Sequence, residues 1–131
     1  MQHKLFVGYP ATGKTYTMQE MAKLSGGFVV SPYDAEYDEW PVKSLPIDSA
    51  VDLAKGDVDI TIYIDSILII AQDPSTRQSF KLFISYLENC KKLKMVASSQ
   101  DEKMAIRLLG TKIIDKTEII HKKRDWDSES N

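Results

Sequence analysis

The sequence predicts an α/β domain in which a mainly parallel sheet of about five strands lies between two layers of helices. Two observations predict this three-layer αβα fold. Short apolar runs alternate along the chain with longer segments in which apolar residues recur every three or four positions. A helix between two strands favours parallel pairing, because the chain must cross the sheet before the next strand begins. The length of 131 residues suits one such domain.

The predicted strands are short apolar or β-branched runs that end near turn-forming residues. The clearest run is ITIYI at residues 60–64. Its β-branched and aromatic residues favour a strand that is buried on both faces. The other strands are predicted at residues 4–7, 28–30 and 94–97, with a last strand or strand pair at Ile113–Ile114 and 118–121.

The predicted helices occupy intervals between these strands. The first begins at Lys14 or Thr15 and is stopped by Gly26-Gly27. A later helix follows Asp73-Pro74, because proline is favoured in a first turn and the apolar residues after it keep helical spacing. Further helices are predicted at residues 49–55 and 101–109, ended by Gly56 and Gly110.

Composition excludes several classes of protein. The chain has 17 Lys and Arg against 19 Asp and Glu, which excludes a uniformly basic nucleic-acid coat. A single cysteine, Cys90, excludes an internal disulfide and favours the cytoplasm. The most apolar stretch, residues 60–71, is interrupted by Asp65 and is shorter than a membrane helix, so no membrane partner is expected. We expect a single minimal domain at residues 1–121 and a polar C-terminal tail at 122–131.

Residues 8–15, GYPATGKT, fit the phosphate-binding pattern G-x-x-x-x-G-K-[ST] at every fixed position. Gly8 and Gly13 allow backbone N–H groups to converge on phosphate oxygens, and the following helix directs its positive end at the same place. Lys14 adds a charge toward the β- and γ-phosphates, and the Thr15 hydroxyl is a ligand for Mg²⁺. No N-K-x-D guanine-reading motif is present, which favours ATP. The predicted nucleotide-binding residues are Gly8, Tyr9, Pro10, Ala11, Thr12, Gly13, Lys14, Thr15 and Tyr16.

A carboxylate follows the clearest strand. Asp65 ends the run at 60–64, which is the position of the acidic residue that holds Mg²⁺ in phosphate-loop enzymes. With this second motif the chain resembles the P-loop NTPases over most of its length, the two motifs corresponding to Walker A and Walker B. The resemblance implies ATP and Mg²⁺ as cofactors, Thr15 and Asp65 as metal-binding residues, and Lys14 and Asp65 as catalytic residues.

The order of the later motifs refines the resemblance. A strand ending in Ser98-Ser99-Gln100 precedes a helix that carries Arg107. This order is similar to that of RecA-like, DNA-translocating and viral packaging ATPases, in which a strand lies between the phosphate-loop strand and the acidic strand. The resemblance implies that one of these polar residues, Gln100 for preference, senses the γ-phosphate. It also implies that Arg107 reaches a γ-phosphate across a subunit interface; an ordinary exposed helix arginine is the alternative.

The residue after Asp65 departs from the commonest pattern. Ser66 stands where motor ATPases usually have a catalytic glutamate. RecA-like ATPases also carry Asp-Ser here and supply the glutamate from the end of a neighbouring strand. On that resemblance Glu36 is the general base, with Asp34 and Glu39 as substitutes; a solvated acidic loop is the alternative.

The expected function is that of a Mg-dependent ATPase in DNA packaging, translocation or another DNA transaction, working as a homo-oligomer or with a larger partner subunit. On this interpretation two groups of basic residues form one edge for nucleic acid; solvated ends of helices and strands are the alternative. Two alternatives remain: a small-molecule or nucleotide kinase, which the presence of only three arginines disfavours, and a nucleotide-dependent switch with little hydrolysis, which Ser66 permits. The compact form suggests a virus or mobile element, and then the host cytoplasm. The basic residues are Lys91, Lys92 and Lys94, and Lys122, Lys123 and Arg124.

Overall fold

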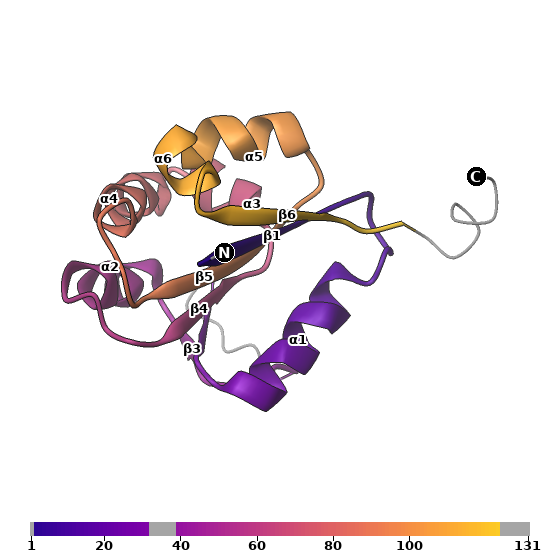
Figure 1. Ribbon diagram of the computed structural model, residues 1–131, viewed down its shortest axis with the longest axis horizontal. Coiled ribbons are helices and arrows are strands. Elements are labelled where there is room, and N and C mark those ends of the chain that lie inside the picture. Colours follow the sequence, from indigo (N-terminus) through magenta and orange to yellow (C-terminus); the bar gives the residue numbers. More distant parts are fainter. Residues whose placement is uncertain (1, 32–38, 124–131) are drawn as a thin grey trace.

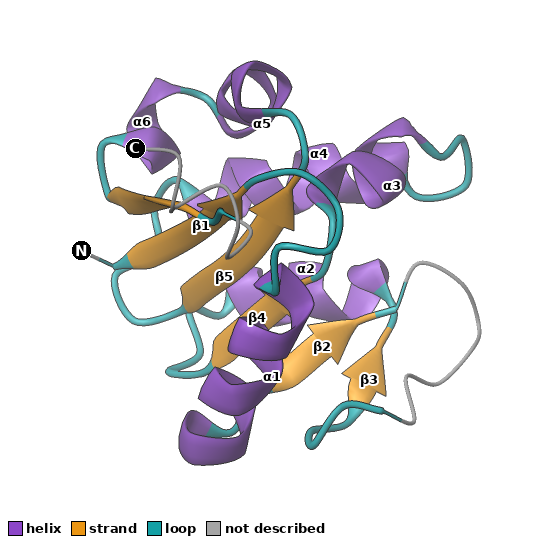
Figure 2. Cartoon of the chain, turned by 90° about the vertical axis from the view of Figure 1, so that its right-hand side faces the viewer, coloured by secondary structure: helices purple, strands orange, loops and turns teal. Residues whose placement is uncertain are grey.

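The computed structural model describes residues 2–31 and 39–123 (Figures 1 and 2). The strands are β1 (His3–Val7), β2 (Phe28–Val30), β3 (Ser44–Leu45), β4 (Thr61–Ile64), β5 (Lys94–Ser99) and β6 (Thr117–His121). The helices are α1 (Lys14–Ser25), α2 (Ile47–Lys55), α3 (Ile67–Gln72), α4 (Arg77–Leu87), α5 (Glu102–Leu109) and α6 (Thr111–Ile114). None of these described helices has the length and apolar character needed to cross a membrane.

The strands form one parallel sheet in the order β3-β2-β4-β5-β1-β6. The predicted α/β fold with a parallel sheet is therefore confirmed. β5 lies between β1 and β4, as the resemblance implied. Val7 pairs with Ser99, and Ile64 pairs with Ala97. The carboxyl ends of these three central strands consequently meet at one edge of the sheet.

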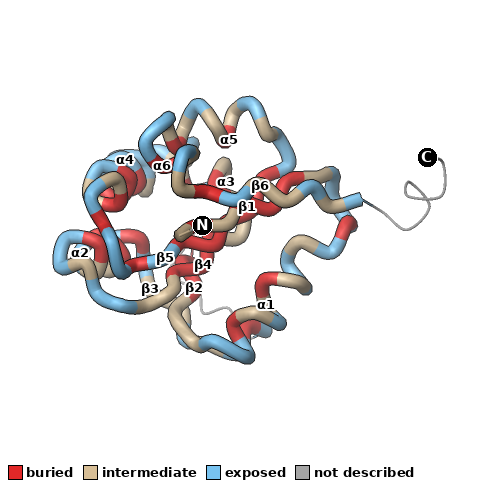
Figure 3. The backbone as a smooth tube through the Cα atoms, in the orientation of Figure 1, coloured by how far each residue is buried: buried red, intermediate tan, exposed pale blue. Residues whose placement is uncertain are grey.

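Alternate residues of the central strands point into two separate cores. On β1, Leu5 and Val7 enter the larger core with the apolar residues of α2 to α6, whereas Phe6 enters the smaller core beneath α1. Figure 1 shows α1 alone on its face of the sheet, with the other helices on the opposite face. Figure 3 shows the buried residues concentrated on the strands and on the inner sides of the helices. The three layers are present, but the two helical layers are unequal.

The first helix ends where the chain must pass close to the sheet. Gly27 has φ +117°, and a Cβ there would lie 2.2 Å from the carbonyl oxygen of Thr61. Only glycine fits such an approach without moving the backbone. The Gly26-Gly27 pair therefore returns the chain to the sheet directly after α1, and β2 begins at Phe28 beside β4.

The predicted strand at Ile113–Ile114 is wrong. These residues belong to α6, in which the N–H of Ile114 donates to the carbonyl of Gly110 and the side chain of Ile113 is fully buried. Two isolated apolar residues fit a helical turn as well as a strand, and Gly110 provides the sharp change of direction that separates α5 from α6. The sequence also gave no prediction of α3 or of β3.

The predicted basic edge is not formed as a single surface. Lys91 and Lys92 precede β5, whereas Lys122 and Lys123 follow β6. Because all strands run in the same direction, the start of β5 and the end of β6 lie at opposite edges of the sheet. Arg124 lies outside the described residues.

Candidate functional site

The candidate site is the loop between β1 and α1, at the edge of the sheet where β1, β4 and β5 end (Figure 2). Gly8 packs against the chain that leaves β6. A Cβ on Gly8 would lie 2.5 Å from the carbonyl oxygen of Lys122. The N–H of Lys122 also donates to the carbonyl of Val7 at 2.8 Å. The backbone that follows β6 therefore packs directly against the loop, and it leaves no space for a side chain at position 8.

The left-handed backbone of Gly13 turns the loop into α1. Gly13 has φ +83° and immediately precedes Lys14, the first residue of the helix. No side chain caps this helix, so N–H groups of its first turn lack the partner that a cap would supply. Unpartnered N–H groups and the positive end of the helix make this position suitable for an anion.

The ammonium group of Lys14 rests on the loop to which the residue belongs. Its Nζ donates to the carbonyl oxygens of Gly8 at 2.6 Å and of Tyr9 at 2.8 Å. Partial burial lowers the pKa of Lys14, and the nearby carboxylate of Asp65 opposes that shift. The positive charge of Lys14 is thus held between the loop and the end of β4.

Asp65 is held by hydroxyl groups from two other elements. The Oγ1 of Thr15 lies 3.1 Å from Oδ1 and 2.9 Å from Oδ2 of Asp65, and the Oγ of Ser98 lies 3.0 Å from Oδ1. A hydroxyl and a carboxylate are the hard oxygen ligands that Mg²⁺ prefers. No described group of three His, Cys, Asp or Glu residues is arranged to hold a metal. The donor set fits a cation that keeps water and phosphate oxygens as its remaining ligands.

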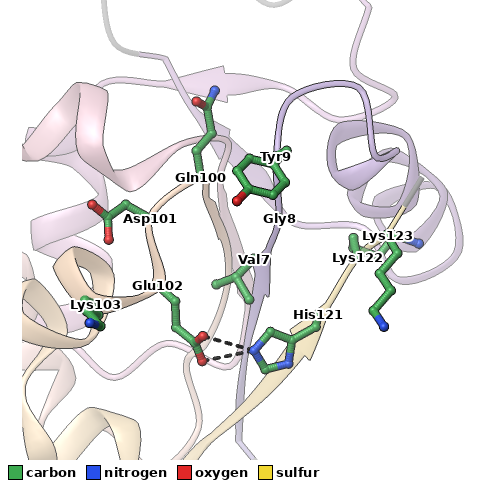
Figure 4. Close-up of a pocket in the computed structure, with 10 residues that line it drawn as sticks. All are labelled: Val7, Gly8, Tyr9, Gln100, Asp101, Glu102, Lys103, His121, Lys122 and Lys123. Carbon is green, nitrogen blue, oxygen red and sulfur yellow. Dashed lines mark hydrogen bonds and ion pairs between the residues drawn. The ribbon is translucent and has the colours of Figure 1, made fainter. Parts of the chain in front are cut away.

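Two cavities adjoin the loop. One, which we call the loop cavity, has a volume of about 390 Å³. The other, which we call the side cavity, has a volume of about 900 Å³ and is shown in Figure 4. Gln100 lines both. The loop cavity is lined by residues 10–16 with Asp65, Ser66, Ser98, Ser99 and Gln100; the side cavity is lined by Val7, Gly8, Tyr9, Gln100, Asp101, Glu102, Lys103, His121, Lys122 and Lys123.

The side cavity has an aromatic side chain and a hydrogen-bonded glutamate–histidine pair among its lining residues. Figure 4 places Tyr9 and Gln100 toward one end, and Glu102 and His121 toward the other. The ring of Tyr9 is largely exposed. The Nε2 of His121 lies 3.0 Å from Oε1 and 3.1 Å from Oε2 of Glu102, which joins the end of β6 to the start of α5. The sequence alone indicated no functional role for Glu102 or His121.

The structure brings most of the predicted site residues together. Each of the predicted loop residues lines one of the two cavities, as does Asp65, and Gln100 lines both. Arg107 is exposed on α5 and lines neither cavity. Glu39 is exposed and likewise lines neither. Asp34 and Glu36 lie outside the described residues, so their roles remain predictions.

Ser98 is the residue of β5 whose side chain contacts Asp65, whereas the role of Gln100 as the sensor of the γ-phosphate stays a prediction. The register between β4 and β5 explains this contact. Ile64 pairs with Ala97, so that Asp65 and Ser98 each stand one residue beyond that pair. The sequence alone did not define the register, and Ser98 could therefore not be separated from its two polar neighbours.

Comparison with known proteins shows a shared fold. The chain matches no protein-family model and no curated protein. Among solved structures it is similar to a chain from "Structural Basis for Katanin Self-Assembly", with a TM-score of 0.53 and 17% identity. The match covers 92% of this chain and 40% of the katanin chain, so this chain spans well under half of that length. With the strand order, this likeness supports a P-loop NTPase-like αβα fold.

Proposed function

We propose that the chain binds ATP with Mg²⁺ in the loop cavity and hydrolyses the nucleotide. The observation that carries this proposal is the convergence of Lys14, Thr15 and Asp65 at the carboxyl edge of the sheet. Thr15 and Asp65 are 50 positions apart in the sequence, yet their side chains are in contact. A structural turn alone does not require a lysine, a hydroxyl and a carboxylate at one point.

The residues of the loop have separate roles in this proposal. Lys14 exchanges its carbonyl partners for β- and γ-phosphate oxygens, which its flexible stem allows. The N–H groups of the loop and of the first turn of α1 hold the same phosphates. Thr15 and Asp65 would hold Mg²⁺, which when bound neutralises charge on the phosphates. The proposed sensor of the γ-phosphate is Gln100, and its support is that this residue lines both cavities.

The side cavity is the place we propose for the nucleoside. It adjoins Gly8 and Tyr9 and is more than twice as large as the loop cavity. The exposed ring of Tyr9 offers a stacking surface for a base. Carboxylates at Asp101 and Glu102 are acceptors for an exocyclic amine or for ribose hydroxyls.

Hydrolysis in this proposal needs a general base beyond Asp65. Asp65 is the only carboxylate among the described residues of the loop cavity, and it accepts hydrogen bonds from Thr15 and Ser98. The proposed base is Glu36. Its support is that β2, which precedes it, pairs with β4, which ends at Asp65. Ser66 after Asp65 favours a second candidate, a nucleotide-dependent switch with little turnover.

The proposed working form is an oligomer engaged in a DNA transaction. The similar katanin structure is described as one of self-assembly, and Arg107 is exposed on α5 where a second copy can meet it. The DNA partner is supported by the order of the motifs. DNA-stimulated turnover, measured together with the mass in solution, tests both parts.

Equilibrium binding of a fluorescent ATP analogue, with and without Mg²⁺, tests nucleotide binding directly. Lys14→Ala should lose binding. Lys23→Ala, which removes an exposed lysine from the last turn of the same helix, should bind as the parent chain does. Equal affinity of Lys14→Ala and the parent chain would overturn the proposal.

A further inference from the structure

A buried hydroxyl at the end of β5 connects the two residues that follow β4. Ser98 is 1% exposed. The backbone N–H of Ser66 donates to its Oγ at 2.7 Å, and the same Oγ lies 3.0 Å from Oδ1 of Asp65. One serine side chain therefore contacts both the carboxylate of Asp65 and the backbone of the next residue.

The direction of these two hydrogen bonds is fixed by chemistry. A backbone N–H can only donate, so Ser66 uses a lone pair of the Ser98 oxygen. The single hydroxyl proton of Ser98 is then free for Oδ1 of Asp65, which accepts in its ionised form. A carboxylate accepting from a hydroxyl is a charge-assisted bond, among the stronger ones in proteins.

The turn held by Ser98 has an uncommon backbone. Ser66 has φ +70° and ψ +92°, in a region that a residue with a side chain rarely adopts. Such a conformation persists only where its surroundings hold it. The bond to Ser98 holds the Ser66 N–H in place, and this turn sets the direction in which Asp65 leaves β4.

We propose that Ser98 is a positioning residue for Mg²⁺, which acts by fixing the carboxylate of Asp65 and the turn at Ser66. The inference rests on the proposed nucleotide-binding function of the same cavity. Thr15, the other residue proposed to hold the metal, contacts both oxygens of Asp65. With the contact from Ser98, donors from α1 and β5 fix the carboxylate in one orientation before any metal binds.

A neighbouring serine provides a matched control. Ser99 is also 1% exposed and follows Ser98 on the same strand. Its Oγ donates to the carbonyl of Asp101 at 2.9 Å and accepts from the N–H of Asp101 at 3.1 Å. Its hydroxyl thus serves the turn before α5 instead of Asp65. Ser99 also lines the loop cavity, but Ser99→Ala removes the same group at the same burial without removing a hydrogen bond to the carboxylate of Asp65.

The experiment measures how the affinity for a non-hydrolysable ATP analogue depends on Mg²⁺ concentration. Mg²⁺ should increase the affinity for the analogue, and Ser98→Ala should raise the Mg²⁺ concentration that gives half of this increase by about tenfold or more. Loss of a residue that orients a metal ligand has an effect of this size. Affinity for the analogue in the presence of EDTA should not change. Ser98→Thr, which restores a hydroxyl, and Ser99→Ala should both follow the parent chain.

Amide hydrogen exchange in the metal-free protein gives a second readout. The amide of Ser66 should exchange faster in Ser98→Ala than in Ser99→Ala, because its acceptor has been removed. If Ser98→Ala does not fold, Ser98→Cys keeps nearly the same volume with only a weak S–H donor and must show the same shift in Mg²⁺ dependence.

The outcomes separate the two proposals. A parent chain that binds no nucleotide overturns the proposed function itself. A parent chain with Mg²⁺-dependent binding that Ser98→Ala leaves unchanged overturns the role of Ser98 alone. An equal loss of affinity with Mg²⁺ and with EDTA also overturns it, since Ser98 would then support the cavity in general.

Discussion

Acid should destabilise this protein through one buried histidine, His3. Its side chain is fully buried at the start of β1. The N–H of Met95 donates to Nδ1 of His3 at 3.0 Å, which requires the neutral ring to carry its proton on Nε2. Nε2 has no hydrogen-bond partner among the described residues. A second proton would force Nδ1 to donate where it now accepts, and would place a charge where no partner can stabilise it.

The direction of the pH effect follows from the pKa of His3. Burial, together with the positive charge of Lys116, lowers this pKa from 6.5 to about 4. Between these two values the unfolded chain binds a proton that the folded chain does not bind, so stability falls as the pH falls. At about 1.4 kcal/mol for each pKa unit, the loss between pH 7 and pH 4 is roughly 3 kcal/mol, a large part of the stability of a small domain.

Urea unfolding at intervals between pH 7.5 and pH 4 measures this loss. The control is His3→Asn, whose side-chain oxygen keeps an acceptor for Met95 but does not titrate. Its absolute stability will differ because the ring is lost, so the comparison is between slopes against pH. The parent chain should lose about 3 kcal/mol more than the variant over this range. Parallel slopes would refute the reasoning.

Three further outcomes are expected. Gly8→Ala should destabilise the fold more than Gly26→Ala, because a Cβ at Gly8 meets the backbone of Lys122 whereas one at Gly26 meets nothing within 4 Å; thermal unfolding of both variants checks this. Cys90 should resist a thiol reagent at pH 8 in the folded protein but react in urea. Burial, and to a smaller extent the negative charge of Asp57, raises the pKa of its thiol to about 11 in the folded protein. Glu36→Gln should bind ATP with unchanged affinity and lose most of its turnover, as single-turnover kinetics will show; normal turnover would remove Glu36 from the mechanism.

The position of the loop between β1 and α1, and that of Asp65 after β4, could be predicted from the sequence because each is defined locally. The loop is contiguous, and Asp65 directly follows a run that only a buried strand explains. Helix α3 was missed because residues 67–71 continue the apolar run of β4, and the strained turn at Ser66 that separates the two has no sequence signature. The Glu102–His121 pair depends on how α5 packs beside β6, which no local pattern reports.

Ser98 and Ser99 at the buried end of β5, with Gln100 directly after them, show why the order of motifs alone could not assign a role to each residue. Ser98 points toward Asp65, Ser99 holds the turn that starts α5, and Gln100 lines both cavities. Successive residues of a strand face opposite sides, so adjacent serines cannot share a partner. Ser98 therefore belongs with Asp65, while Ser99 ties the end of β5 to the helix that carries Arg107.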